Sequence, residues 1–305
     1  MPGLIKKEEF KDNCGFGLIA NINGIKSHKV IINSINALIS MTHRGGVGSD
    51  GKTGDGCGLL FDIDHKFFAE TVLKEQNIEI GEHFAISQIF YNQDIAKLLP
   101  KIKKILKSEN LVLAAYRKVP VDEKVLGEIA HSCLPEIFQL FIKPTEKDFN
   151  QEVFETGLIQ ARKYIEEIYM DDEKLYVCSM SSKTVVYKGL MLPNAIKEFY
   201  LDLNQESFRA STCVFHQRFS TNTSPRWHLA QPFRLLAHNG EINAIRGNRN
   251  WVKARSSKFK TPLIPKIQKF KQLVNETGSD SSSLDNMIEL LVKGGVDIFR
   301  AIRMV

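Results

Sequence analysis

A cysteine stands at position 14, between the polar stub MPGLIKKEEFKDN and the apolar run GFGLIA. A thiolate is a good nucleophile, but a thiol with an ordinary pKa of about 8.5 needs a base to become one. Cleavage after Asn13 would give Cys14 a free α-amine, and its pKa of about 7.7 to 8.0 suits that task. The two interpretations are a buried structural cysteine and a nucleophile at the start of a processed chain.

A second group of reactive residue types lies at 212–251, a segment dense in His, Arg, Asn and aromatic residues. The stretch AHNGEI predicts a strand that ends at Ala237 and a turn at Asn239-Gly240. A side-chain amide and a backbone N–H at this turn could stabilise a developing oxyanion, although Asn-Gly is also a plain hairpin turn. Arg218 in HQRFST could bind a carboxylate through two parallel hydrogen bonds, or form a surface ion pair.

Asp280 in GSDS precedes a predicted helix. Its carboxylate could cap that helix, bind an ammonium group, or do both. His216, His228 and His238 suggest a metal, but no ligand spacing or acidic partner supports one. We therefore expect no metal site.

The elements that must position these residues alternate between strands and helices. Apolar patterns predict a strand at 14–22, a helix from Ser27 to about Thr42, a glycine-rich turn region at 43–58 and a buried strand directly after it. Further strands are predicted at 83–91, 111–119 and 136–143, with helices at 94–110, which Pro100 could interrupt, and at about 148–170. The segment at about 81–143 could form an inserted α+β subdomain, and KLYVCSM and KTVVYKG predict a hairpin.

Composition limits the class of protein. The 305 residues allow one large domain or two ordinary ones, with 43% hydrophobic residues and a net charge of +6. No nucleic-acid motif, secretion signal or membrane-spanning run is present, so we expect neither nucleic acid nor membrane as a partner. Five dispersed cysteines favour reduced thiols in the cytoplasm, and Cys57, Cys133, Cys178 and Cys213 are interpreted as core residues.

Seven motifs occur in an order that suggests a family: CGFGLIA, MTHRGG, KTGDGCG, HQRFSTNT, AQPFR, AHNGEIN and NETGSDSSSLDNM. From Cys14 onward the chain resembles the N-terminal class II glutamine amidotransferase domain of the glutamate synthase large subunit. The resemblance implies an α+β fold, the four-layer αββα arrangement of the N-terminal-nucleophile hydrolases. It also implies hydrolysis of L-glutamine to glutamate and ammonia for glutamate biosynthesis.

The resemblance assigns roles to individual residues. Cys14 would be the nucleophile, released by removal of residues 1–13 as a propeptide, and Asn239 and Gly240 would be the oxyanion pair. Arg218 would bind the α-carboxylate of glutamine and Asp280 its α-ammonium. Thr221 and His238 would line the same pocket, and Arg44 would lie close to the nucleophile.

The chain departs from the family at its end. The family domain continues past DNMIELL into strands that close the sheets, and here these strands are expected to be missing. FMN and an iron–sulfur cluster are expected only in a synthase domain or subunit that would receive the ammonia, with no cofactor in this chain. One alternative is a catalytically inactive, truncated amidotransferase-like module for binding or assembly, and a more distant one is an acylase acting on another amide.

Overall fold

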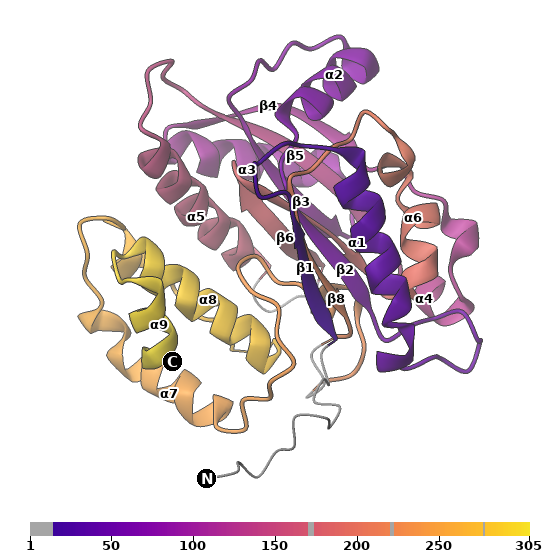
Figure 1. Ribbon diagram of the computed structural model, residues 1–305. Coiled ribbons are helices and arrows are strands. Elements are labelled where there is room, and N and C mark those ends of the chain that lie inside the picture. The colour runs from indigo at the N-terminus through magenta and orange to yellow at the C-terminus, as the bar shows by residue number, and fades with distance from the viewer. Residues whose placement is uncertain (1–14, 170–173, 220–222, 277) are drawn as a thin grey trace.

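Two antiparallel sheets form the centre of the structure, a computed structural model that describes residues 15–169, 174–219, 223–276 and 278–305 (Figure 1). The strands in these residues are β1 (Phe16–Ala20), β2 (Cys57–Asp62), β3 (Ala85–Tyr91), β4 (Leu111–Lys118), β5 (Glu136–Pro144), β6 (Leu175–Ser181), β7 (Thr184–Gly189) and β8 (Thr212–Gln217). The helices in the same residues are α1 (His28–Ser40), α2 (His65–Gln76), α3 (Ile95–Ser108), α4 (Glu128–Ser132), α5 (Gln151–Glu167), α6 (Ile196–Phe199), α7 (Ile245–Arg255), α8 (Asp280–Lys293) and α9 (Ile298–Met304).

Strand β1 lies at an edge of the first sheet, whose order across the described strands is β1-β8-β2-β7. Its antiparallel register with β8 pairs Phe16 with His216. At the end of this ladder the backbone N–H of Gln217 donates to the carbonyl oxygen of Gly15 at 2.5 Å. The residues that follow Cys14 therefore lie beside the HQRF motif, although the two are far apart in the sequence.

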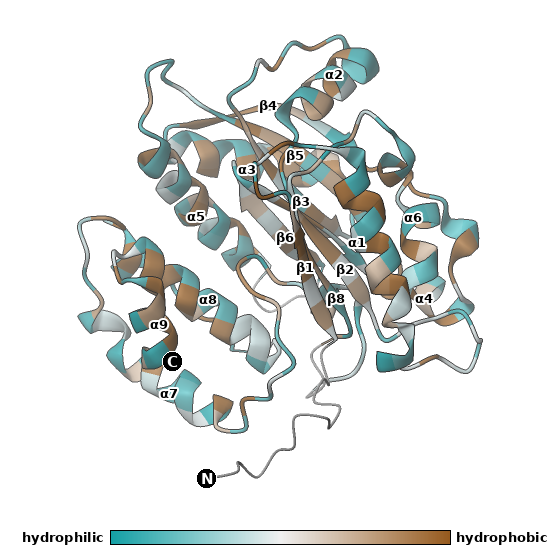
Figure 2. Cartoon of the chain, in the orientation of Figure 1, coloured by the Kyte–Doolittle hydropathy of each residue, from teal (hydrophilic) through white to brown (hydrophobic). Residues whose placement is uncertain are grey.

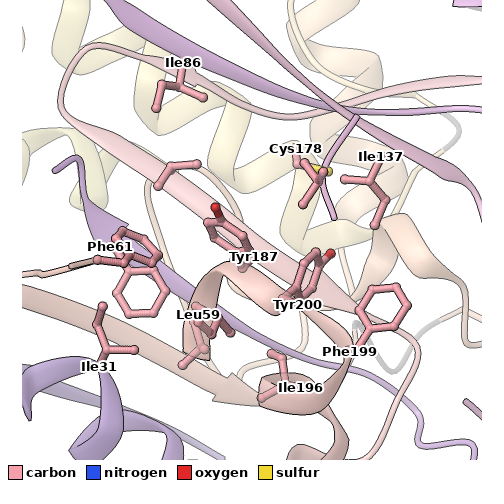
Figure 3. Packing of buried hydrophobic residues seen from close by; sticks show 14 of the residues in the cluster. Ile31, Leu59, Phe61, Ile86, Ile137, Cys178, Tyr187, Ile196, Phe199 and Tyr200 are labelled. Atoms are coloured by element: carbon pink, nitrogen blue, oxygen red, sulfur yellow. The ribbon is translucent and has the colours of Figure 1, made fainter. Parts of the chain in front are cut away.

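The second sheet has the order β4-β5-β3-β6 in the described residues. Strands β3, β4 and β5 come from the segment at about 81–143 for which we considered a separate subdomain. Side chains of β3 and β5, among them Ile86 and Ile137, belong to the same hydrophobic cluster as Leu59 of β2 (Figure 3). The segment thus builds one layer of a core that both sheets share.

The predicted hairpin of KLYVCSM and KTVVYKG is wrong. Both stretches are strands, but β6 pairs with β3 in the second sheet and β7 pairs with β2 in the first. A short connection at Ser182 and Lys183 joins the two strands. The chain crosses here from one sheet to the other because each strand finds its hydrogen-bonding partner elsewhere.

Residues of β5 show how the two hydrophobic clusters are separated. Ile137 and Phe141 face the cluster shared with the first sheet, whereas Phe138 and Leu140 face helices α3 and α5. This is the period-two alternation of a strand buried on both faces. Figure 2 shows hydrophobic residues concentrated along the strands and on α1, with hydrophilic ones on the outer helix surfaces.

The helix predictions agree with the structure within a few residues. Helix α1 begins at His28 after Ser27, whose hydroxyl makes no capping bond, and the turn Thr42–Arg44 follows it. Helix α3 continues through Pro100, so the interruption we considered there does not occur. Its apolar stripe is buried and keeps the helix packed on the second sheet.

Three of the described cysteines, Cys57, Cys178 and Cys213, are buried as predicted. Cys133 is exposed, so its interpretation as a core residue is wrong. It lies at the C-terminal end of the short helix α4, where the chain runs along the surface. None of the described helices combines the length and hydropathy that a membrane crossing requires.

Candidate active site

A cavity of about 230 Å³ opens at the end of β8. It is lined by residues from distant parts of the sequence: Gly15, Arg44, His216, Gln217, Arg218, Phe219, Gln231, His238, Asn239, Gly240, Glu241 and Ser281. Gly15, the residue that follows Cys14 in the sequence, is part of this wall.

Most residues predicted for the site meet here. Those that line the cavity are Arg44, Arg218, His238, Asn239 and Gly240. Asp280 directly precedes the lining residue Ser281. Cys14 and Thr221 lie outside the described residues, so the structure does not locate their side chains.

The stretch from Ala237 to Gly240 is irregular, and the strand predicted to end at Ala237 is not formed. Asn239 and Gly240 are exposed at the mouth of the cavity. The side-chain oxygen of Asn239 lies over Gly15, 3.2 Å from the point where a Cβ atom on that glycine would be. The Asn239 side chain thus lies next to the residue that follows the predicted nucleophile, the neighbourhood in which an oxyanion donor is expected.

Arg218 is held from one side by a carboxylate. Its Nε lies 3.5 Å from Oδ2 of Asp55, and half of the Arg218 side chain is exposed while that of Asp55 is nearly buried. Burial raises the pKa of Asp55, and the N–H of Gly46 and the charge of Arg218 oppose this rise. The pair orients a half-exposed guanidinium that lines the cavity.

Asp280 is buried beneath the oxyanion loop, which we define as residues 238–242. Its Oδ2 accepts a hydrogen bond from the backbone N–H of Ile242 at 2.8 Å. The N-cap of α8 is Ser279, whose hydroxyl accepts from the N–H of Ser282 at 3.0 Å, so the capping role considered for Asp280 is wrong. Asp280 is the first residue of the helix, where a carboxylate is favoured by the helix dipole.

Burial favours the neutral form of two histidines of the site. Burial lowers the pKa of His216 to about 4. Burial also lowers the pKa of His238, and the nearby charge of Asp280 opposes that shift. The His216 ring is stacked on Phe16, with centroids 6.1 Å apart and planes 11° from parallel. Strand β1 and the cavity wall are thus packed together through aromatic rings.

The described cysteines do not have the properties of a nucleophile. Burial raises the pKa of Cys178 and of Cys213 to about 12, and raises those of Cys57 and Cys133. A thiol with a raised pKa is not ionised near neutrality and reacts slowly. Among the described residues no group of three His, Cys, Asp or Glu side chains is arranged to hold a metal ion.

Three residues at the site had no role in the sequence analysis. Asp55 and Gln231 stand in KTGDGCG and AQPFR, two motifs that carried the resemblance, but no physical pattern pointed to their contacts. Gln217 ends β8 and is completely buried, and neither polar atom of its side chain has a hydrogen-bond partner in the described part of the chain. A buried amide at a cavity wall is available to water or a ligand.

The chain belongs to the class II glutamine amidotransferases. The family described as "Glutamine amidotransferases class-II" matches residues 14–305, which begin at the predicted nucleophile.

Within this family the chain is similar to several glutamate synthases. It is 37% identical over 317 residues to "Glutamate synthase [NADH]" of Saccharomyces cerevisiae, a match that covers 99% of this chain and 15% of the relative. It is 37% identical over 295 residues to "Glutamate synthase [NADPH] large chain" of Azospirillum brasilense, covering 94% and 19%. It is 37% identical over 294 residues to "Ferredoxin-dependent glutamate synthase" of Cyanidium caldarium, covering 93% and 19%. The chain thus spans less than a fifth of the length of these relatives.

Proposed function

We propose that this chain is the glutaminase part of a glutamate synthase and hydrolyses L-glutamine to glutamate and ammonia. The observation that carries the proposal is the single cavity at which Gly15, Arg218, Asn239 and Gly240 meet. These residues supply the attachment point of a nucleophile, a cation for a carboxylate, and two donors for an oxyanion. Their convergence suits hydrolysis of an amino-acid amide better than a general binding role.

The reaction begins at Cys14. The free α-amine of Cys14 takes the thiol proton, and the sulfur attacks the side-chain amide carbon of glutamine. A C–S bond forms while the carbonyl electron pair moves to oxygen, where the Asn239 amide and the Gly240 N–H stabilise the negative charge. Collapse breaks the C–N bond, and the nitrogen takes the proton from the α-amine and leaves as ammonia. Water then attacks the thioester, again with the amine as base, to release glutamate and restore the thiol.

The other predicted residues hold the substrate. Arg218 pairs with the α-carboxylate of glutamine, because a guanidinium matches a carboxylate in plane and charge. Asp280 pairs with the α-ammonium, and Thr221 and His238 shape the pocket. Arg44, which lines the cavity, favours the thiolate through its charge.

We also propose that residues 14–305 have the four-layer αββα fold of the N-terminal-nucleophile hydrolases. The two sheets and the helices packed on them support this proposal. In this proposal residues 1–13 are a propeptide. The ammonia passes to an FMN-binding synthase domain or subunit, which also carries the iron–sulfur cluster. This reaction takes place in the cytoplasm, the compartment predicted from the dispersed cysteines.

The test is ammonia release from L-glutamine by the purified chain, followed with a coupled assay. Cys14→Ala should abolish release, whereas Cys133→Ala, which removes an exposed thiol elsewhere, should not change it. A diazoketone analogue of glutamine should add to one cysteine, and peptide mass analysis should place the adduct on Cys14. A folded chain that neither releases ammonia nor reacts with the analogue would support the inactive binding module instead.

A further inference from the structure

The backbone of His238, the residue directly before Asn239, is held by side chains from two other segments. The Gln231 side chain bonds both polar groups of this residue: its Nε2 donates to the His238 carbonyl at 3.1 Å, and its Oε1 accepts the His238 N–H at 3.2 Å. His216 Nε2 donates to the same carbonyl at 2.9 Å. One peptide carbonyl therefore receives two side-chain donors.

Both anchoring side chains are fixed in their own positions. Gln231 is buried, and its backbone N–H donates to the carbonyl oxygen of Arg218 at 3.1 Å. His216 is buried within β8 and stacked on Phe16 of β1. Buried, hydrogen-bonded side chains have little freedom to follow a moving loop, so they hold the loop in place.

The carbonyl of His238 belongs to the peptide unit whose nitrogen is that of Asn239. Because a peptide unit is planar, fixing its carbonyl also fixes the direction in which the chain enters Asn239. At the other end of the oxyanion loop the N–H of Ile242 is bonded to Asp280. Between these two anchors Asn239 and Gly240 are exposed and belong to no helix or strand.

We infer that Gln231 and His216 are positioning residues that orient the oxyanion donors by holding the His238 peptide. The inference rests on the proposed function, since it assumes that Asn239 and Gly240 bind the oxyanion. Preorganised donors lose much of their effect when they are displaced by about 1 Å, a shift that can cost about a hundredfold in rate. His216 and Gln231 thus connect the oxyanion loop to β1, through the stacking on Phe16, and to the backbone of Arg218.

Gln231→Glu tests the inference with the smallest change in shape. As a carboxylate the new side chain still accepts the His238 N–H, but it cannot donate to the carbonyl and repels it. We expect kcat for glutamine hydrolysis near pH 8 to fall roughly tenfold to a hundredfold, with little change in KM, because ground-state contacts are untouched. Burial raises the pKa of a carboxyl, and the protonated form donates again. The ratio of variant to wild-type kcat should therefore rise as the pH is lowered toward 5.

Gln139→Glu is the control for the same exchange of a buried amide, because Gln139 lies in the core, is hydrogen-bonded to Gln88, Tyr187 and Arg117, and does not line the cavity. It should change the melting temperature, but not the kcat of folded protein or its pH profile. His216→Phe is the second variant, which keeps the ring on Phe16 and removes one donor. It should lower kcat by a smaller factor than Gln231→Glu, and it serves if the first variant does not fold.

The outcomes distinguish a failure of the positioning inference from a failure of the proposed function. If Asn239→Ala lowers kcat strongly while Gln231→Glu and His216→Phe keep wild-type kcat at every pH, the positioning inference is overturned and the proposed function stands. If Asn239→Ala is also fully active, the oxyanion assignment itself is wrong. A fall in kcat for Gln231→Glu that recovers at low pH supports the inference, since a general loss of stability would not follow that profile.

Discussion

Asn239 and Gly15 are in close contact, with the Asn239 side-chain oxygen 3.2 Å from the point where a Cβ atom on Gly15 would stand. The carbonyl oxygen of Gln217 lies at the same distance from this point on another side. A side chain at position 15 would therefore press against the sheet and the oxyanion loop together. Glycine here allows the predicted oxyanion donor to approach the backbone next to the nucleophile.

Gly15→Ala should reduce catalysis more than folding. The added methyl must displace the Asn239 side chain by a few tenths of an ångström, because the Gln217 backbone is held in the sheet. We expect kcat for glutamine to fall roughly tenfold, with the melting temperature little changed. Gly247→Ala is the control, since nothing lies within 4 Å of its added carbon and alanine favours the helix α7. If Gly15→Ala were as active as Gly247→Ala, the close approach of Asn239 to Gly15 would not matter for catalysis.

Asn239→Ala removes one oxyanion donor. The expected loss is about 10²- to 10³-fold in kcat with a small change in KM, the usual cost of one such donor in an amide-cleaving site. Initial rates over a range of glutamine concentrations give both constants. Asn250→Ala, on the exposed surface of α7, should behave as wild type. A near-normal rate for Asn239→Ala would remove this residue from the mechanism.

Arg218→Lys and Asp280→Asn should weaken substrate binding. Lysine keeps the charge but loses the planar pair of donors, so KM for glutamine should rise severalfold or more. Asp280→Asn should raise KM similarly, and its neutral amide also alters the bond to Ile242. Arg246→Lys on the surface of α7 is the control for the exchange of arginine for lysine. Unchanged affinity in both variants would place the amino-acid pocket elsewhere.

Stability should depend on pH through histidines whose pKa is lowered by desolvation, above all His216 and His228. Burial lowers the pKa values of His216 and His228 to about 4, against about 6.5 in an unfolded chain. Between these values the unfolded state takes up protons that the native state does not. The free energy of unfolding therefore falls as the pH drops from about 6.5 to about 4, by about 1.4 kcal/mol for each pKa unit of each histidine.

Urea unfolding at several pH values measures this dependence. His228→Phe should flatten the slope between pH 6.5 and 4 relative to wild type, because it removes one group that takes up a proton in the unfolded state but not in the native state. The ring would still pack against Tyr176, which lies 5.2 Å away between centroids. An identical slope in the variant would show that His228 is not the source.

The active chain should begin at Cys14. While Asn13 is attached, the nitrogen of Cys14 is an amide without basicity, and only cleavage turns it into an amine that can take the thiol proton. N-terminal sequencing and intact mass should find residues 1–13 removed from protein that hydrolyses glutamine. Cys14→Ala should remain uncleaved if the thiol starts its own release. Active protein that still begins with Met1 or Pro2 would rule out the α-amine mechanism.

The sequence by itself determined the family and most of the elements. Seven motifs in a fixed order carried the resemblance to the class II glutamine amidotransferases, and the family match confirms it. Taken alone, the residue types of Cys14, the AHNGE stretch and Arg218 each left a structural alternative open. Alternation and helical periodicity located β1 to β7 and the helices α1, α3, α5 and α8, because burial on one face or two leaves a local pattern; β8, α2 and α7 were not predicted. The apolar periodicity predicted α3 correctly, although the helix contains Pro100, a residue type that usually ends a helix.

Only the tertiary structure decided which elements meet. The patterns of β6 and β7 predict two strands but do not say that each pairs in a different sheet, since a strand's partner is set by contacts far away in the sequence. The same holds for the hydrogen bonds of Gln231 to His238, and for Asp55 beside Arg218. A side chain bonded to a distant backbone leaves no periodic signal, because its partner is chosen by how the whole chain packs.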